Sequence, residues 1–273
     1  MVLGNPIAKG NTAEIYLTDD KVVKLFKDYL PDTESMNEAK KQKYAYSCGL
    51  PVPNVFEVIK IQNRQAIIME HVKGDNIGDL LLNNLNEAER YIGLCVNEQK
   101  KIHAIHVNTD EMELMRERLE SQIKSVHKLD ENKKKNILLK LDSITFDFRL
   151  CHGDFHPDNV LMDDQLWVID WMTGVVGEPA ADAARSVVMF SMGAMPPGAS
   201  ALSRMMIGFI RKKLTKGYFR EYLRLSGLTY EDVDRWILPI AAARLVEGLP
   251  PPEKELLVKE VRKRLQTLTV GLT

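Results

Sequence analysis

The sequence has few cysteines and no secretion signal. Its three cysteines, Cys48, Cys95 and Cys151, are odd in number and far apart, with none of the spacings of a disulfide framework or a zinc knuckle. We therefore expect a reducing, cytoplasmic compartment. The first residues carry no basic patch followed by a long apolar segment, so no secretion signal is predicted.

The sequence also lacks an excess of charge of either sign and lacks a long apolar run. Lysine and arginine number 37 against 38 aspartates and glutamates, a net charge of -1. No overall field would draw the protein onto nucleic acid or an anionic membrane, although local patches remain open. The longest charge-free run, residues 186–203, is broken by Pro196-Pro197-Gly198, which favours two buried segments joined by a turn over a membrane span. We expect no membrane or nucleic-acid partner, and the oligomeric state stays open.

The chain has 273 residues, of which 45% are hydrophobic, and this is enough to form one or two globular domains. Residues 1–72 are β-rich, and a turn-forming Thr-Asp-Asp separates two extended pieces at 14–17 and 21–26. One helix is predicted after Pro31, where Ser35 and Glu38 have capping-box spacing. Extended patterns resume at residues 50–62 and 65–72, so this part is a sheet carrying one helix.

Residues 73–273 are mainly helical in pattern. Apolar residues repeat at helical spacing over 87–106 and 111–127, and Thr229 and Asp232 have capping-box spacing further on. A hairpin-like pair over 159–170 is the exception. We expect an α+β protein with a small N-terminal part, residues 1–72, and a larger helical part, residues 73–273, with a ligand bound between two such unequal lobes.

The stretch CHGDFHPDNVLM, residues 151–162, gathers several polar groups that could carry chemistry. His152 and His156 are four apart, as metal ligands on one helix face would be. Gly153, Asp154 and Pro157 make a helix improbable here, so that spacing carries little weight. A two-metal phosphatase block is also disfavoured, because the companion Asp-x-His and Gly-Asn-His-Asp segments are absent.

The acids and the amide of the same stretch favour phosphoryl transfer. That reaction needs a carboxylate to orient and accept the proton of the attacking hydroxyl, and oxygen ligands to hold Mg²⁺ on the nucleotide phosphates. Asp154 and Asn159 lie five apart in a loop, and Asp170 ends the following strand. A loop, a tight hairpin and a returning strand can bring all three together.

HGDFHPDNVLM, then VIDW, then GEPAADAAR resemble the corresponding motifs of the aminoglycoside phosphotransferase and choline kinase family, relatives of the protein kinases. The resemblance implies a bilobal protein-kinase-like fold, with a small antiparallel sheet and one helix in the N-terminal lobe. It also implies that Asp154 is the catalytic base and that Asn159 and Asp170 are the Mg²⁺ ligands. His152 and Asp182 would support the catalytic loop.

The resemblance extends to residues 1–72. Lys24, at the centre of a strand, matches the lysine that grips nucleotide phosphates, in preference to Lys21 and Lys27, and Glu38 matches its ion-pair partner. The turn at Gly10 has a single glycine where protein kinases have three. Further nucleotide contacts are expected at Gly10, Asn11 and Thr12 for the phosphates and at Met69, Glu70 and His71 for the base.

The implied activity is a small-molecule kinase that transfers the γ-phosphoryl group of ATP or GTP, with Mg²⁺, to a substrate hydroxyl. The acceptor is open among aminoglycosides, choline, homoserine, a thiosugar and a macrolide. A non-catalytic nucleotide-binding sensor of the same fold is the alternative. Retention of Lys24, Glu38, Asp154, Asn159 and Asp170 together favours the enzyme, because a sensor could dispense with the base.

Overall fold

The computed structural model describes residues 3–108, 111–193, 198 and 200–270. Pro196 and Pro197, which belong to the predicted turn at 196–198, lie outside the described residues. Contacts divide the chain into two compact units, residues 1–85 with 152–174 and residues 86–151 with 175–273. The polar loop and the strand end that follows it thus belong to the first unit. The predicted boundary between residues 72 and 73 stays a prediction.

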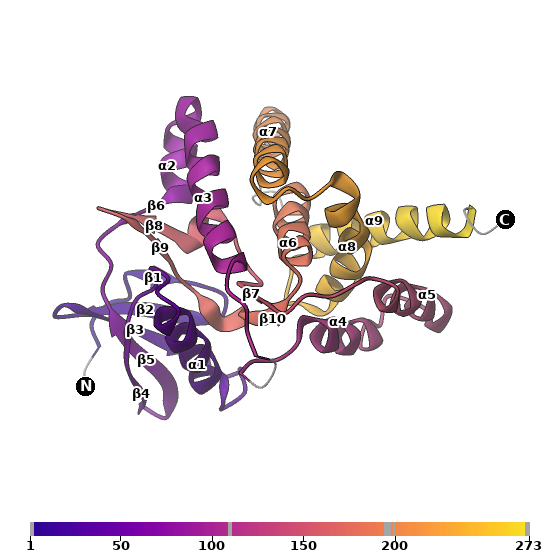
Figure 1. Ribbon diagram of the computed structural model, residues 1–273. Helices are drawn as coiled ribbons and strands as arrows, with labels where there is room; N and C mark the ends of the chain where they lie inside the picture. The colour runs from indigo at the N-terminus through magenta and orange to yellow at the C-terminus, as the bar shows by residue number, and fades with distance from the viewer. Residues whose placement is uncertain (1–2, 109–110, 194–197, 199, 271–273) are drawn as a thin grey trace. The chain divides into compact units, whose positions relative to one another are not determined.

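The first unit is built on a five-stranded antiparallel sheet in the order β1-β2-β3-β5-β4 (Figure 1). Tight turns join its hairpins. Gln62 and Asn63 both have positive φ between β4 and β5, as a two-residue hairpin turn requires. The strands are β1 (Ala8–Lys9), β2 (Ala13–Thr18), β3 (Lys21–Phe26), β4 (Val55–Ile61) and β5 (Arg64–Glu70).

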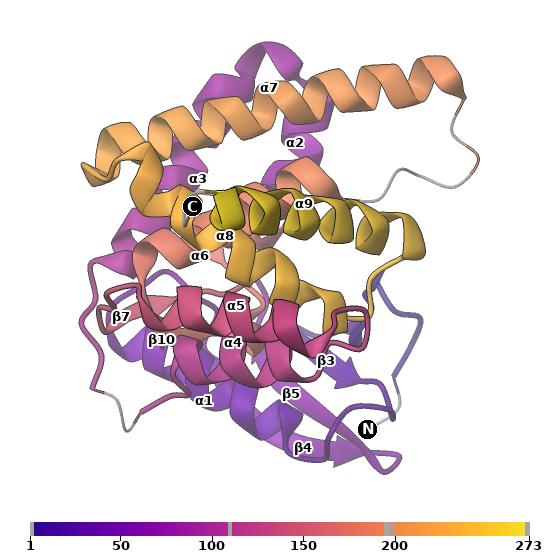
Figure 2. The same ribbon diagram turned by 90° about the vertical axis from the view of Figure 1, so that its right-hand side faces the viewer.

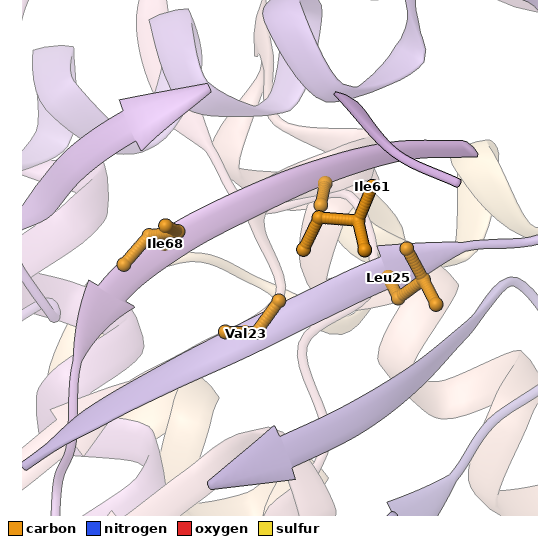
Figure 3. Packing of buried hydrophobic residues seen from close by; sticks show 5 residues of the cluster. Val23, Leu25, Ile61 and Ile68 are labelled. Carbon is orange, nitrogen blue, oxygen red and sulfur yellow. The ribbon is translucent and has the colours of Figure 1, made fainter. Parts of the chain in front are cut away.

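Both faces of the central strand β3 are packed. Val23 and Leu25 join a cluster with Ile61 and Ile68 on one face (Figure 3). On the other face Phe26 packs in a cluster that includes Ala39 of helix α1 (Glu34–Ser47). The alternation expected for β3 is confirmed. Lys24 is buried, and a buried ammonium group must be paired.

Helix α1 does not begin with the predicted capping box. Thr33 is the N-cap and makes no side-chain cap hydrogen bond. The two residues at box spacing have partners elsewhere in the unit. The Ser35 backbone N–H donates to Gln65 Oε1 at 2.8 Å, and Glu38 accepts from Lys24. Tertiary contacts therefore overrode the local signal.

The remaining elements of the first unit surround the polar loop. The predicted hairpin is confirmed as strands β8 and β9, and β6 pairs with β8 to complete a three-stranded sheet. The elements are β6 (Asp75–Asn76), α2 (Ile77–Asn83), the 3₁₀ turn Pro157–Asn159, β8 (Val160–Met162), β9 (Leu166–Val168) and the 3₁₀ turn Trp171–Thr173.

The second unit is mainly helical, which confirms the predicted α+β class. Among its described residues, the one strand pair is β7 (Arg149–Cys151) with β10 (Val175–Gly177). The capping box predicted at Thr229 and Asp232 is present at the start of α8. The helices are α3 (Ala88–His103), α4 (Met115–Lys124), α5 (Glu131–Asp142), α6 (Pro179–Met192), α7 (Ala201–Ser226), α8 (Tyr230–Ala243) and α9 (Pro251–Val270), with 3₁₀ turns at Leu85–Glu87 and Arg244–Val246. Across the described part of the chain, no helix combines the length and apolar content that a membrane crossing needs.

Candidate functional site

Lys24 joins three distant segments of the first unit. Its Nζ donates to Glu38 Oε1 at 2.7 Å and to Asp170 Oδ1 at 2.9 Å, across 14 and 146 residues of sequence. The Lys24 and Glu38 side chains are 7% and 1% exposed, whereas that of Asp170 is 39% exposed. The lysine, its expected partner and an expected metal ligand therefore meet at one point.

Charge and burial act in opposite directions in this cluster. Burial alone would lower the pKa of Lys24, but the carboxylates of Asp170 and Glu38 raise it above its usual value. Burial raises the pKa of Glu38 to about 7, against the opposing effect of Lys24. Glu38 Oε2 is buried and has no hydrogen-bond partner among the described residues. The ion pair thus keeps Lys24 charged. Its cost is the desolvation of the buried Glu38 carboxylate, which is seen in the raised pKa of Glu38.

Asp170 is held in an unusual backbone conformation after β9. Its φ of 64° and ψ of 68° place it in the left-handed region, which aspartate tolerates better than most residues. Burial would raise the pKa of its carboxyl, but Lys24 lowers the pKa below its usual value. At neutral pH Asp170 therefore presents an ionised and partly exposed carboxylate.

The loop from His152 to Asn159 is shaped by its glycine. Gly153 has a φ of +76°, and a Cβ there would lie 2.3 Å from the carbonyl oxygen of Thr173, so only glycine fits without a shift. The loop closes on itself, because the Asn159 side-chain amide N–H donates to the backbone oxygen of Asp154 at 2.9 Å. This bond orients the Asn159 side chain, and no described residue donates to its Oδ1.

His152 and Trp171 connect the loop to the segment that carries Asp170. The His152 ring nitrogen Nε2 lies 3.0 Å from the backbone oxygen of Ile169, and its ring centroid is 4.9 Å from that of Trp171. The Trp171 indole N–H donates to the backbone oxygen of Val168. Both side chains are buried. A shift of the loop would therefore disturb the position of Asp170.

His156 is a member of the site that the sequence left unassigned. Its Nε2 lies 3.6 Å from Asp154 Oδ2, and its Nδ1 lies 3.3 Å from Asp158 Oδ2. Burial lowers the pKa of His156, but hydrogen bonds with the two carboxylates outweigh it and raise the pKa to about 9. The only hint in the sequence was that Asp154 and Asp158 flank His156 at two residues on either side. In a loop this spacing does not determine where the side chains point.

The predicted phosphate-binding turn lies between β1 and β2. The Gly10 N–H donates to the Ala13 oxygen at 2.8 Å, and the Thr12 oxygen accepts from the Lys27 N–H at 2.9 Å. The Asn11 backbone oxygen accepts from the Tyr29 hydroxyl. These bonds form an ordered turn, and its contact with phosphate stays a prediction.

The predicted base-binding residues lie at the end of β5 and just after it. Met69 is buried opposite Val22, and the Glu70 carboxylate accepts from the Asn54 N–H at 3.1 Å. His71 follows the strand. Recognition of a base by this segment also stays a prediction.

Asp182 lies in the second unit, in a buried polar cluster. Its Oδ2 is 2.9 Å from His103 Nε2 and accepts from the Gln99 side-chain amide at 3.0 Å, while His103 Nδ1 meets the Tyr222 hydroxyl. The role of Asp182 in supporting the catalytic loop stays a prediction.

Cys151 is fully buried, and burial raises the pKa of its thiol well above the usual value, so it is no thiolate nucleophile.

The donor chemistry of the first unit fits a magnesium ion. Asp170 supplies an ionised carboxylate, and Asn159 supplies an amide oxygen whose orientation is fixed by the bond from its own nitrogen. Hard oxygen donors of this kind suit Mg²⁺, which commonly binds one or two protein groups together with nucleotide phosphates.

Comparison with known proteins supplies a family and a fold. The family model described as "Phosphotransferase enzyme family" matches residues 4–220. A search of the curated proteins found no match. The apo form of a thermostable mutant of aminoglycoside phosphotransferase APH(4)-Ia aligns with a TM-score of 0.63 at 15% identity, covering 98% of this chain and 94% of that one.

Two other solved structures are similar over nearly their whole length. Choline kinase LicA from Streptococcus pneumoniae has a TM-score of 0.61 at 13% identity, over 96% of this chain and 94% of that one. The streptomycin-ATP-APH(2")-IIa ternary complex has a TM-score of 0.59 at 15% identity, over 95% and 90%. At these identities the likeness establishes a kinase-like fold, as the sequence motifs implied.

Proposed function

Because the chain belongs to the phosphotransferase enzyme family, we propose that it transfers the γ-phosphoryl group of ATP or GTP, with Mg²⁺, to a hydroxyl group of a small molecule. The reaction class, phosphoryl transfer to an alcohol, follows from the family. The nucleotide, the metal and the roles of individual residues belong to the proposal. A similar protein in complex with ATP and streptomycin supports the nucleotide.

The contact of Lys24 with both Glu38 and Asp170 carries the proposal. In protein kinases the pair of this lysine with its glutamate and the metal-binding aspartate must both be in place for transfer. Glu38 fixes the lysine from the buried side, and Asp170 is the more exposed of the two carboxylates. This arrangement suits a lysine that reaches phosphate on its open side.

Each residue of the proposed site then has one role in the reaction. Asp154, whose carboxylate is partly exposed, accepts the proton of the substrate hydroxyl as that oxygen bonds to the γ-phosphorus. The bond from γ-phosphorus to the β–γ bridging oxygen breaks, and the nucleoside diphosphate leaves. Lys24 pairs with phosphate oxygens, and Asn159 and Asp170 would hold Mg²⁺. When bound, the metal neutralises charge that develops on the phosphates.

The acceptor is proposed as an alcohol that carries a cationic nitrogen group, the chemistry shared by the acceptors named for the similar proteins. Streptomycin is named in one complex, hygromycin B in another, and choline in the name of a third protein. The screen should therefore contain aminoglycosides, choline and homoserine, with a macrolide and a thiosugar as acceptors of other chemistry. Phosphorylated product, read by mass with ATP and with GTP, identifies the acceptor.

Two isosteric variants test the residue roles. Asp154→Asn should keep Mg²⁺-dependent nucleotide binding and lower transfer by about 10² to 10⁴-fold, the usual contribution of a general base. Asp170→Asn should lose the Mg²⁺ dependence of nucleotide binding as well as transfer. Asp164→Asn, an exposed acid on the turn between β8 and β9, is the matched control and should change neither.

Nucleotide binding is measured by thermal shift with and without Mg²⁺, and transfer with the acceptor found in the screen. Unchanged turnover in Asp154→Asn or in Asp170→Asn would contradict the roles proposed for these residues. Stabilisation by nucleotide together with failure to phosphorylate any acceptor, while nucleotide alone is not hydrolysed either, would count against the proposed reaction.

A further inference from the structure

Helix α7 of the second unit carries an apolar stripe that the described structure leaves uncovered. Leu202, Met205, Met206 and Phe209 follow one another at helical spacing, so they share one face. Their exposed fractions are 68%, 68%, 59% and 69%. Single exposed apolar residues are ordinary, but four large ones on one helix face mark a surface that binds something apolar.

The same face becomes basic further along the helix. Lys212, Lys213 and Lys216 are exposed and continue the stripe, and no described residue forms an ion pair with any of them. No acidic residue occurs from Ser200 to Arg220. Over the same residues six are basic: Arg204, Arg211, Lys212, Lys213, Lys216 and Arg220. The face is therefore apolar at one end and cationic at the other, over about 27 Å of helix. Figure 2 shows α7 lengthwise.

A groove between α3 and α7 borders the basic end. Its volume is about 400 Å³, and Ala88, Ile92 and Gly217 supply its apolar lining, while Lys213 and Lys216 supply positive charge. The remaining lining residues, Arg220 and Glu89, pair with each other at 3.2 Å. The groove gives the cationic end a recess that an acidic group with an apolar neighbour would fit.

Although the overall charge led us to expect no membrane partner, we propose that this local patch of α7, the face from Leu202 to Arg220, docks on an anionic lipid bilayer. A bilayer offers both chemistries in adjacent layers, anionic headgroups for the lysines and acyl chains for Phe209 and the methionines. A nucleic-acid duplex would match the charge but has no apolar surface for the stripe. A second copy of the chain would cover the stripe but would bring further unpaired cations rather than anions. The docking is independent of the proposed reaction.

Vesicle sedimentation tests the proposal with the full chain. Vesicles of phosphatidylcholine and phosphatidylglycerol in equal parts should carry the protein down, and vesicles of phosphatidylcholine alone should not. A basic residue near an anionic surface contributes roughly fivefold to binding, so Lys212→Gln with Lys213→Gln should weaken it by roughly 25-fold. Phe209→Ser should weaken it by roughly tenfold. High salt should release the protein.

Exposed positions on α9 give matched controls. Leu256→Ser, and Lys259→Gln with Lys263→Gln, make comparable changes on a helix that also carries acids, at Glu253, Glu255 and Glu260, and neither should alter sedimentation. All variants should unfold at the wild-type temperature, because every changed side chain is exposed. Wild type that fails to bind anionic vesicles, or α7 variants that bind like wild type, would overturn the proposal. So would light scattering that finds a dimer which Phe209→Ser dissociates, because a second copy would then occupy the face.

Discussion

Replacing Lys24 with methionine should destabilise the protein by an amount that depends on pH. Methionine keeps most of the aliphatic stem and removes the ammonium group. Glu38, at 1% exposure, is then a buried carboxylate with no cation beside it, whereas Asp170 stays partly solvated. Removal of one partner from a buried pair typically costs about 3–5 kcal/mol. We expect a loss of that size in the free energy of unfolding where Glu38 is ionised.

The sign of the pH dependence follows from Glu38. Its folded-state pKa of about 7 lies above its ordinary 4.5, so its contribution to stability is present below the ordinary value and is lost as pH rises through 7. The difference corresponds to about 3 kcal/mol. Without Lys24 the folded-state pKa rises further, since the ammonium opposes the rise. The variant should therefore lose less stability at about pH 5, where only the pairing of Lys24 with the ionised Asp170 is lost, than at about pH 9, where Glu38 is also left ionised.

Urea unfolding at these two pH values measures the effect, and a second substitution isolates its cause. Lys24→Met with Glu38→Met removes the orphaned charge, and apolar replacement of a whole buried ion pair is often neutral, so the double variant should regain most of the loss. Lys21→Met, an exposed lysine on the same strand, should change stability by less than about 0.5 kcal/mol. An equal loss at both pH values, or a double variant weaker than the single one, would refute the reasoning.

Two further predictions concern backbone fit and a surface ion pair. Gly153→Ala should lower the free energy of unfolding by more than about 2 kcal/mol, because it combines a positive φ with a Cβ 2.3 Å from a carbonyl oxygen. Gly4→Ala, whose Cβ meets nothing within 4 Å, should be nearly neutral in the same urea titration. Asp234→Asn should cost about 1 kcal/mol at neutral pH, because Arg264 donates to both carboxylate oxygens at 2.8 and 2.9 Å. These bonds lower the pKa of Asp234, so its contribution is present above the ordinary value of 3.8 and fades as pH falls through the lower folded-state value; a loss that persists in acid would contradict this cause.

The sequence was sufficient for features that depend on local periodicity. Alternation on residues 21–26 placed Lys24 opposite Val23 and Leu25, and the two packed faces of β3 confirm that register. The capping box of α8 was equally readable, because its two partners, Thr229 and Asp232, bond to each other, and the further contact of Asp232 is with Arg235 of the same helix. The box expected at Ser35 and Glu38 failed because both residues bond to other strands of the sheet.

The residues of the candidate site were predicted from residue type and spacing, whereas their conformation had no signal in the sequence. The spacing of Asp154, Asn159 and Asp170 predicted three oxygen groups near one point, a base at Asp154 and metal ligands at the other two. The left-handed backbone at Asp170 has no sequence signal, because its cost of about 1–3 kcal/mol is offset by tertiary contacts such as the bond from Lys24. The contacts of His156 were unreadable for a related reason, since they depend on how the positive φ of Gly153 turns the loop.

Burial distinguishes the two carboxylates that share Lys24. Glu38 is almost wholly enclosed and has a raised pKa, so it is suited to fixing the lysine and poorly suited to a metal, which needs an ionised and accessible oxygen. Asp170 is accessible, and the same lysine lowers its pKa, so it stays ionised without a bound metal. One ammonium group thus keeps the proposed metal ligand, Asp170, ionised and is itself positioned by Glu38. Swapping aspartate and glutamate between positions 38 and 170 would not swap these proposed roles. Each role depends on how deeply its position is buried in the fold.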